Sequence, residues 1–301
     1  MQRCILLAHS ALNAEWIVQL DAAMKCCGLE LVLVGDEPPV RDEAWDRRVF
    51  VAYQQSHLTP ASGANRAVIA ATATDWGCAI QPNDLAGIRN MTAEYAAALT
   101  WPADVYVTDE VVEKSALDAT EIELFPGFFI RPPTLGKGDG RPEGRRVAKV
   151  AELFRRGLPS AGLGTEWDPG FLTALSYRGD PIDAAAPIDM AGPPRALVKG
   201  PYFTLTPGRW EVTIQFSLDE LGSGNDLRIE WGPPEQFVSV RARPKLAGLY
   251  QAVLVQEWRE VGFAEIIVEL MNGCIGGTFK LLRVDVKLIE DPNRSEIGAR
   301  W

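Results

Sequence analysis

Polar side chains that could do chemistry follow the apolar runs in the first half of this 301-residue chain. A histidine, a serine or a carboxylate placed directly after a buried strand can act as a general acid or base, or can bind a polar ligand. Such strand ends meet at one edge of an open α/β sheet, where these sheets bind their ligands. The candidates for catalysis are Asp109, Glu110 and His9, and those for ligand binding at this edge are Ser10, Asp36 and His57.

Three carboxylates form a compact acidic group around one of these strand ends. They are Asp104, Asp109 and Glu110, in the segment ADVYVTDE. Two carboxylates at a strand end can act as an acid/base pair or hold a metal. They can equally begin the helix expected over 109–118, where Thr108 and the two acids after it would cap the helix and complement its dipole. We favour the cap, and we assign no metal.

Short apolar runs alternate with segments of helical periodicity over residues 1–157, which predicts an open, mostly parallel, Rossmann-like α/β sheet. The first strand, helix and second strand predict a parallel pair joined by a right-handed crossover. Asn13 would cap that helix and Gly28 would end it. The strands expected here are 4–8, 29–34, 49–53, 78–80 and 104–108, and the helices are 13–27, 62–76, 92–99, 109–118 and 144–157.

Composition and missing motifs exclude several classes of partner. The dinucleotide fingerprint GxGxxG and the phosphate loop GxxxxGK[ST] are both absent, so the sequence identifies no cofactor. The net charge of −10 argues against nucleic acid, whose binders depend on basic patches. No apolar run approaches the roughly 20 residues that a membrane helix needs.

The five cysteines are odd in number, scattered and without a CxxC pair, which argues against a disulfide framework and a zinc site. The start, MQRCILLAHSAL, has no clear small-residue cleavage site and is interpreted as a first strand instead of a signal peptide. We therefore expect reduced, mostly buried thiols in a cytoplasmic protein.

Residues 158–194 are rich in glycine and proline, and we expect a linker or an irregular excursion over the surface. The predicted organisation is therefore an α/β domain over 1–157, this linker over 158–194, a β-sandwich over 195–290 and a tail over 291–301.

Alternation of apolar and polar side chains recurs along residues 195–290. In RWEVTIQFSL, residues 209–218, the alternation directs Trp210 into the core. About eight short strands with turns between them predict an all-β jelly-roll sandwich. Tyr250–Val255 is apolar on both faces, as expected of a central strand.

Trp258 stands among charged residues in QEWRE, which is the best setting in this region for an exposed aromatic that binds sugar. The alternative is a rim aromatic that closes the core. Asn272 and the pair Asp219 and Glu220 lie in expected turns, and no spaced acidic loop supports calcium binding there.

Two stretches of the first half carry family resemblances. ILLAHSALNAEWIVQLDAAMKCCGLELVLV resembles the opening strand–helix–strand of a TIR domain, in which a serine follows the first strand, as Ser10 does here. We place no counterpart of that family's catalytic Glu downstream, so NAD cleavage is not expected. ADVYVTDEVVEKSAL, followed by ELFPGFFIRP, is similar to a late strand and loop of GT-B glycosyltransferases, where the sheet edge meets a nucleotide-sugar. A full enzyme of that type has two such domains, and one fits here.

The back third carries a further resemblance. KGPYFTLTPGRWEVTIQF, with GLY at 248–250 and GGTFKLLRVDVKL near the end, resembles jelly-roll modules attached to bacterial polysaccharide-related proteins, including glycosyltransferases. Carbohydrate-binding modules share that architecture, so the resemblance implies a jelly roll over about a third of the chain and leaves the ligand open.

Three functions follow as hypotheses. The first is a cytoplasmic protein of surface-polysaccharide metabolism, whose α/β domain binds a nucleotide or sugar and whose sandwich binds carbohydrate or a protein partner. The second is a glycosyl- or nucleotide-processing enzyme in the α/β domain, using Asp109 or His9. The third is a non-catalytic interaction protein whose sandwich contacts another subunit.

Overall fold

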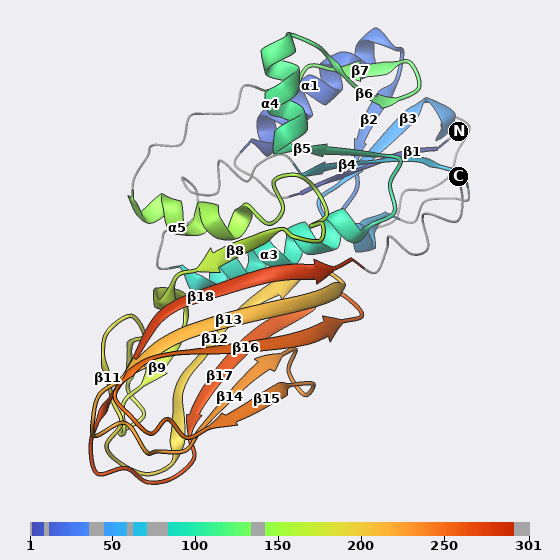
Figure 1. Cartoon of the computed structure of the whole chain (residues 1–301). Coiled ribbons are helices and arrows are strands. Elements are labelled where there is room, and N and C mark those ends of the chain that lie inside the picture. The colour runs from blue at the N-terminus through green and yellow to red at the C-terminus, as the bar shows by residue number, and fades with distance from the viewer. Residues whose placement is uncertain are drawn as a thin grey trace. The chain divides into compact units, whose positions relative to one another are not determined.

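The chain folds into two compact units, one formed by residues 1–82 and 94–158 and the other by residues 83–93 and 159–301. The computed structural model describes residues 2–8, 12–35, 45–58, 63–70, 84–133 and 142–291. The first unit holds a parallel sheet and the second holds a β-sandwich (Figure 1). No described helix is both long enough and apolar enough to cross a membrane.

The first unit is built on five parallel strands in the order β2-β3-β1-β4-β5. Strands that are covered on both faces have continuous apolar sequences, and β1, β3 and β4 are buried over most of their length. The predicted parallel sheet is therefore present. Its strands are β1 Arg3–Leu7, β2 Glu30–Leu33, β3 Arg48–Ala52, β4 Asn65–Ala70 and β5 Val105–Thr108.

Two predictions for this sheet are wrong. The helix predicted over 62–76 is not found, because the described part of that segment contains β4, which pairs in parallel with β1. The run Ala67–Ala70 is fully buried, and so short an apolar run has no periodicity that separates a strand from a helix. The first two strands are also not neighbours, because β3 lies between β1 and β2. The predicted strand over 78–80 lies outside the described residues.

Helices α1, α3, α4 and α5 lie in the described part of the chain. Helix α1 buries Trp16, Leu20 and Met24 at four-residue spacings, as an amphipathic helix does. Its N-cap is the residue before Asn13, so the predicted cap is wrong by one position. Gly28 follows the helix with φ of +66°, a left-handed conformation that suits glycine. The bounds are α1 Asn13–Cys26, α3 Leu85–Thr100, α4 Asp109–Asp118 and α5 Pro142–Ala151. Three short 3-10 turns also occur in the described residues, η1 Trp45–Arg47, η2 Gln55–His57 and η3 Pro169–Phe171.

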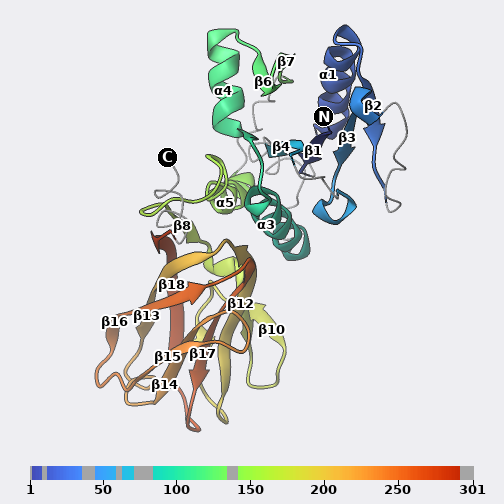
Figure 2. The same cartoon turned by 90° about the vertical axis from the view of Figure 1, so that its right-hand side faces the viewer.

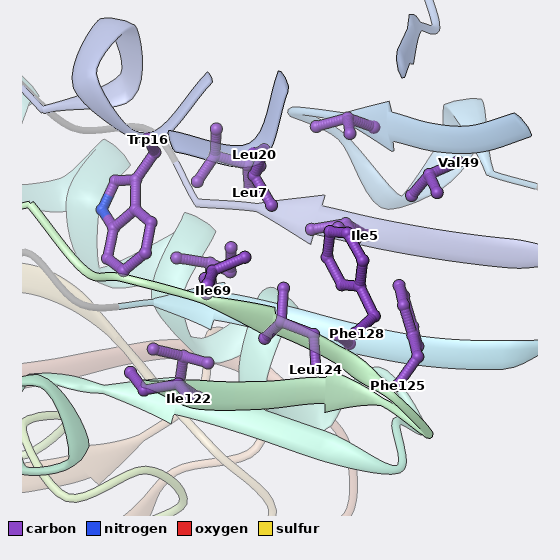
Figure 3. Close-up of a cluster of buried hydrophobic side chains, with 14 of the residues drawn as sticks. Ile5, Leu7, Trp16, Leu20, Val49, Ile69, Ile122, Leu124, Phe125 and Phe128 are labelled. Atoms are coloured by element: carbon purple, nitrogen blue, oxygen red, sulfur yellow. The ribbon is translucent and has the colours of Figure 1, made fainter. Parts of the chain in front are cut away.

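A hairpin completes the core of the first unit. Its strands β6 Ile122–Phe125 and β7 Phe128–Ile130 pair antiparallel, and α1 packs against β7. Figure 3 shows side chains from β1, α1 and this hairpin meeting in one apolar cluster. Phe125 and Phe128 lie in it with ring centroids 5.9 Å apart. The cluster also contains Ile5, Leu7, Trp16, Leu20, Val49, Ile69, Ile122 and Leu124.

The second unit is a sandwich of two antiparallel sheets (Figure 2). One sheet has the order β10-β9-β12-β17-β14-β15, and the other has the order β11-β18-β13-β16 with β8 also paired to β18. The strands are β8 Gly164–Trp167, β9 Thr173–Leu175, β10 Pro181–Asp183, β11 Ile188–Asp189, β12 Arg195–Leu205, β13 Gly208–Leu218, β14 Leu227–Gly232, β15 Val238–Ala242, β16 Gly248–Trp258, β17 Gly262–Leu270 and β18 Thr278–Glu290.

Residues 159–194 belong to the sandwich unit, which corrects the linker predicted over 158–194. They supply β8, β9, β10 and β11, and β8 buries Trp167 completely. Strands of two to four residues carry too little alternation to be recognised in a sequence. Their position is decided by longer partners, since β8 and β11 pair with β18, and β9 pairs with β12.

The strand β13 confirms the alternation that predicts it. Trp210, Val212, Ile214, Phe216 and Leu218 are all buried. The Trp210 indole Nε1 donates to the Thr206 carbonyl at 2.9 Å, which satisfies its one polar group inside the core.

The predicted central position of Tyr250–Val255 is wrong, because β16 forms the edge of its sheet. Leu249 is 78% exposed and Val253 is 50% exposed. Apolar residues on both faces of a strand therefore do not by themselves show that both of its edges are paired.

The first turns of α3 belong to the sandwich unit. The Thr204 amide donates to Thr92 Oγ1 at 3.0 Å, and Arg89 Nε donates to the Pro201 carbonyl at 2.7 Å. The Arg89 guanidinium also lies 4.9 Å from the ring centroid of Tyr202. Burial, with the hydrogen bond to Glu265, raises the pKa of Tyr202 to about 12. These contacts fix the start of α3 against β12.

Candidate functional site

The carboxyl edge of the parallel sheet does not bring the predicted site together in the described residues. His9, Ser10 and Asp36 lie outside the described residues. His57 is half-buried in η2, shortly after β3, and Asp109 follows β5 directly. Since β1 and β4 lie between β3 and β5, those strand ends are roughly 14 Å apart at the usual strand spacing. His57 and Asp109 are therefore too far apart to act as a catalytic pair.

The compact acidic group expected around β5 is divided by that strand. Asp104 precedes β5, and its carboxylate accepts the Arg66 amide at 2.8 Å. Asp109 and Glu110 follow β5 and form the first turn of α4, as the cap hypothesis predicts. Four strand residues separate the two ends by about 13 Å, so Asp104 cannot share a proton or a metal with the others.

The two carboxylates at the start of α4 differ in environment. Asp109 is fully buried, whereas the Glu110 side chain is 61% exposed and lies 3.9 Å from the Arg156 guanidinium. Thr108 is the N-cap of α4 by its backbone conformation but makes no side-chain capping hydrogen bond. Both acids complement the positive end of the helix dipole, and this geometry supports a structural role for Glu110.

Arg155 connects this helix to the segment after α5. Its guanidinium Nη2 donates to both carboxylate oxygens of Glu113, at 2.7 and 2.6 Å. The hydrogen bond to Glu113 is the largest cause that raises the pKa of Arg155, and Asp109 adds to the effect. The charged groups here are engaged with one another, as in a structural ion-pair network.

Trp258 does not present a face to solvent, which corrects its prediction as a sugar platform. It is 2% exposed, and its ring centroid lies 5.0 Å from that of Trp231. Its indole Nε1 lies 3.4 Å from the Phe263 carbonyl. The core gains a large apolar surface from this side chain, as the alternative of a core-closing aromatic predicts.

The Asp219 carboxylate accepts two backbone hydrogen bonds, one from its own turn and one from the first residue of β18. Its Oδ1 accepts from the Gly222 amide at 2.7 Å and from the Thr278 amide at 2.9 Å. The Thr278 hydrogen bond is the largest cause that lowers the pKa of Asp219. No group of three or more metal-ligating side chains occurs among the described residues.

A polar cleft of about 390 Å³ lies at one end of the six-stranded sheet. Asp226 precedes β14, Arg241 and Ala242 end β15, and the residues at 271–272 follow β17. Because β14 pairs with both β15 and β17, the chain brings these three strand ends side by side. The cleft is lined by Asp226, Arg241, Ala242, Arg243, Met271 and Asn272.

Asp226 holds the polar groups of the cleft in place. Its Oδ2 accepts from Asn272 Nδ2 at 2.6 Å, and its Oδ1 lies 3.7 Å from Arg243 Nε. Arg243 Nε also donates to the Gly224 carbonyl at 2.8 Å. The Asn272 amide therefore keeps its carbonyl oxygen as an acceptor, and the Arg243 guanidinium keeps its terminal nitrogens as donors.

Arg241 brings a second guanidinium to the cleft. It lies directly opposite Arg228 across β14 and β15, and Arg228 lies opposite Glu269. Arg228 forms ion pairs with Glu269 and with Glu230, the latter at 3.3 Å. In the described part of the chain, no carboxylate forms an ion pair with Arg241. Its five N–H donors are thus available to a ligand.

The sequence did not predict this cleft, although Asn272 was expected to lie in a turn. Asp226 and Asn272 are 46 residues apart in sequence, and their contact depends on the pairing of β14 with β17. The feature of the sequence that could have indicated the cleft is the set of polar residues at the ends of three predicted strands.

Two further hollows occur in the first unit. One of about 710 Å³ runs along α4 and reaches Pro133, and the residues at 134–141 lie outside the described part. The other, of about 360 Å³, includes Asp104, whose carboxylate is engaged by the Arg66 amide. Neither gathers two residues of the predicted site.

No family model matches the chain, and no curated protein matches it. Similar solved structures include the EclA C-terminal domain, a sugar-binding protein, with 12% identity, 34% of this chain and 78% of that chain covered, and a TM-score of 0.25. TmCBM61 in complex with β-1,4-galactotriose has 11% identity, coverage of 43% and 88%, and a TM-score of 0.27. The CBM22-1 xylan-binding domain from Paenibacillus barcinonensis Xyn10C has 7% identity, coverage of 44% and 90%, and a TM-score of 0.26. At such identities and TM-scores, what these proteins bind is a property of those proteins.

Proposed function

We propose that this protein binds carbohydrate through its β-sandwich, in the cleft of Asp226, Arg241, Arg243 and Asn272. The observation that carries this proposal is the set of hydrogen bonds around Asp226. These bonds leave arginine donors and the Asn272 amide oxygen unused among the residues that line one cleft. Sugar hydroxyl groups both donate and accept, so a cleft that offers both suits them. Its volume of about 390 Å³ lies in the range of small-molecule sites.

The wider role proposed here is in surface-polysaccharide metabolism in the cytoplasm. The four described cysteines are all free, which agrees with a reducing compartment.

Replacing Asn272 with Ala tests the proposal in the full chain. The change removes the free amide acceptor, and we expect roughly three- to tenfold weaker binding to the best ligand of a glycan array, measured by calorimetry. The matched control is Asn225→Ala, whose Nδ2 donates to the Gly222 carbonyl at 2.9 Å and which does not line the cleft. Unchanged affinity in the Asn272 variant, or no glycan bound by the wild type, contradicts the proposal.

A nucleotide or nucleotide-sugar at the parallel sheet is the second candidate function. The strand order supports it, because successive strands run to one side of β1 and then to the other, and open α/β sheets bind ligands at such a switch point. His9 and Ser10 follow β1 in sequence. In this proposal Ser10, Asp36 and His57 contribute to binding, and His9 or Asp109 acts as the acid or base of a glycosyl- or nucleotide-processing reaction.

A thermal-shift screen separates this candidate from the cleft. Nucleotide-sugars, NAD and free nucleotides should raise the melting temperature of the wild type, because a ligand that binds the folded state stabilises it. Ser10→Ala should abolish the shift while leaving glycan binding intact. No shift with any nucleotide ends this second candidate and leaves the sandwich proposal standing.

A further inference from the structure

The cleft of the sandwich differs in charge from the rest of the chain. The whole protein carries a net charge of −10, whereas the cleft lining has two guanidinium groups and one carboxylate. A locally positive cleft in an acidic protein favours an anionic ligand there, since the surrounding field repels anions elsewhere.

The ion pairs around the cleft leave one arginine for this ligand. Arg243 and Asp226 partly neutralise each other, with Nε and Oδ1 3.7 Å apart. Arg228, which lies opposite Arg241, forms ion pairs with both Glu269 and Glu230, so these two carboxylates are engaged by another arginine.

We infer that the cleft binds a carboxylate-bearing sugar, a uronic acid residue within a polysaccharide; this inference rests on the proposed carbohydrate-binding function. The planar guanidinium of Arg241 matches a carboxylate, with two parallel N–H donors for its two oxygens. The Asn272 amide oxygen accepts from a ring hydroxyl of the same sugar. A neutral sugar makes hydroxyl contacts in the cleft but leaves Arg241 without an anion.

The test compares one polymer with and without its charge. Polygalacturonate and its fully methyl-esterified form share a backbone, and the ester lacks the carboxylate. Using the full-length protein, calorimetry should show the acid form binding about tenfold more tightly than the ester, because hydrogen bonds to charged groups are the stronger ones. The difference should shrink as sodium chloride is raised.

Arg241→Gln should remove most of that preference, so that the acid form and the ester bind the variant with similar affinities. The matched control is Arg259→Gln, an exposed arginine in the turn between β16 and β17 that does not line the cleft. Its variant should bind both polymers as the wild type does.

The outcomes separate the inference from the proposed function. Equal binding of acid and ester, or an unchanged preference in the Arg241 variant, overturns the inference while the cleft remains a carbohydrate site. Failure to bind any glycan overturns both. Equally tight binding of poly-glutamate shows a general anion site and overturns the uronic acid assignment.

Discussion

Trp231 and Trp258 pack against each other inside the sandwich, with ring centroids 5.0 Å apart and ring planes at 56°. Both side chains are at most 2% exposed. This contact joins β14 to the end of β16, on different sheets of the sandwich. Trp258, the candidate sugar platform of the sequence analysis, is therefore a core residue that contributes to stability.

Trp258→Ala should lower the free energy of unfolding by about 3–5 kcal/mol, because it empties a large buried volume. Urea denaturation of the full chain measures this. Tyr177→Ala is the control, since that ring is 53% exposed and its loss should cost less than about 1 kcal/mol. If Trp258→Ala lost sugar binding while its free energy of unfolding stayed unchanged, the hypothesis that Trp258 binds sugar would be restored.

Thr92→Val should destabilise the protein by about 1–3 kcal/mol, because the buried Thr204 amide loses its acceptor. Denaturant titration gives the value. Thr100→Val on the same helix is the matched control: its hydroxyl donates to the Ala96 carbonyl, and its loss should cost within about 0.5 kcal/mol. Equal losses in the two variants would contradict the role of Thr92 at the start of α3.

Asp219 should contribute a pH-dependent part of stability. Its folded pKa is lowered by hydrogen bonds from Thr278 and Gly222, so folding favours the carboxylate. The contribution is present above the unfolded pKa of about 3.9 and is lost as the pH falls through the folded value. In Asp219→Asn, the free energy of unfolding should fall less steeply below about pH 4 than in the wild type.

Glu220→Gln is the control for that titration. It lies beside Asp219, and among the described residues its carboxylate makes no ion pair or hydrogen bond. Its stability curve should run parallel to that of the wild type, measured by urea denaturation at each pH. If the free energy of unfolding of the Asp219 variant fell with pH as steeply as that of the wild type, the fold would not favour the charged form of the Asp219 carboxyl group.

The described cysteines should differ in reactivity. Burial raises the pKa of Cys4 to about 11, whereas Cys26 and Cys27 are exposed at the end of α1. Iodoacetamide should label Cys26 and Cys27 in the folded protein and Cys4 only after denaturation, as followed by peptide mass spectrometry. Labelling of Cys4 at the same rate would contradict its burial. The exposed pair also corrects the expectation that the thiols are mostly buried.

The sandwich is the part of the fold that the sequence predicts best. Strands of five to thirteen residues with one buried face show an alternation of apolar and polar side chains that is visible in the sequence, as along β13 and β18. The bounds of helix α4 are predicted to the residue. The helix follows a strand directly, and two acidic residues form its first turn.

The errors fall where a segment is short or depends on a distant partner. The apolar run Ala67–Ala70 of β4 is too short to show a period, so its sequence fits a helix as well as a central strand. Strands β8 to β11 are stabilised by backbone pairing with β18, β12 and one another, which their own short sequences do not predict. An alternating or apolar pattern also does not identify an edge strand, as β16 shows.

By itself the sequence determined the α/β then all-β order of the chain, the buried face of β13 and the place of Trp210 inside it. These features depend on the local periodicity of apolar side chains, which is present within each segment of the sequence. Only the tertiary structure decided that Trp258 is core, that Asp104 and Asp109 lie at opposite ends of a strand, and that Asp226, Arg241 and Asn272 share one cleft. Strand pairing brings such residues together across long stretches of sequence, and that pairing is a property of the whole sheet.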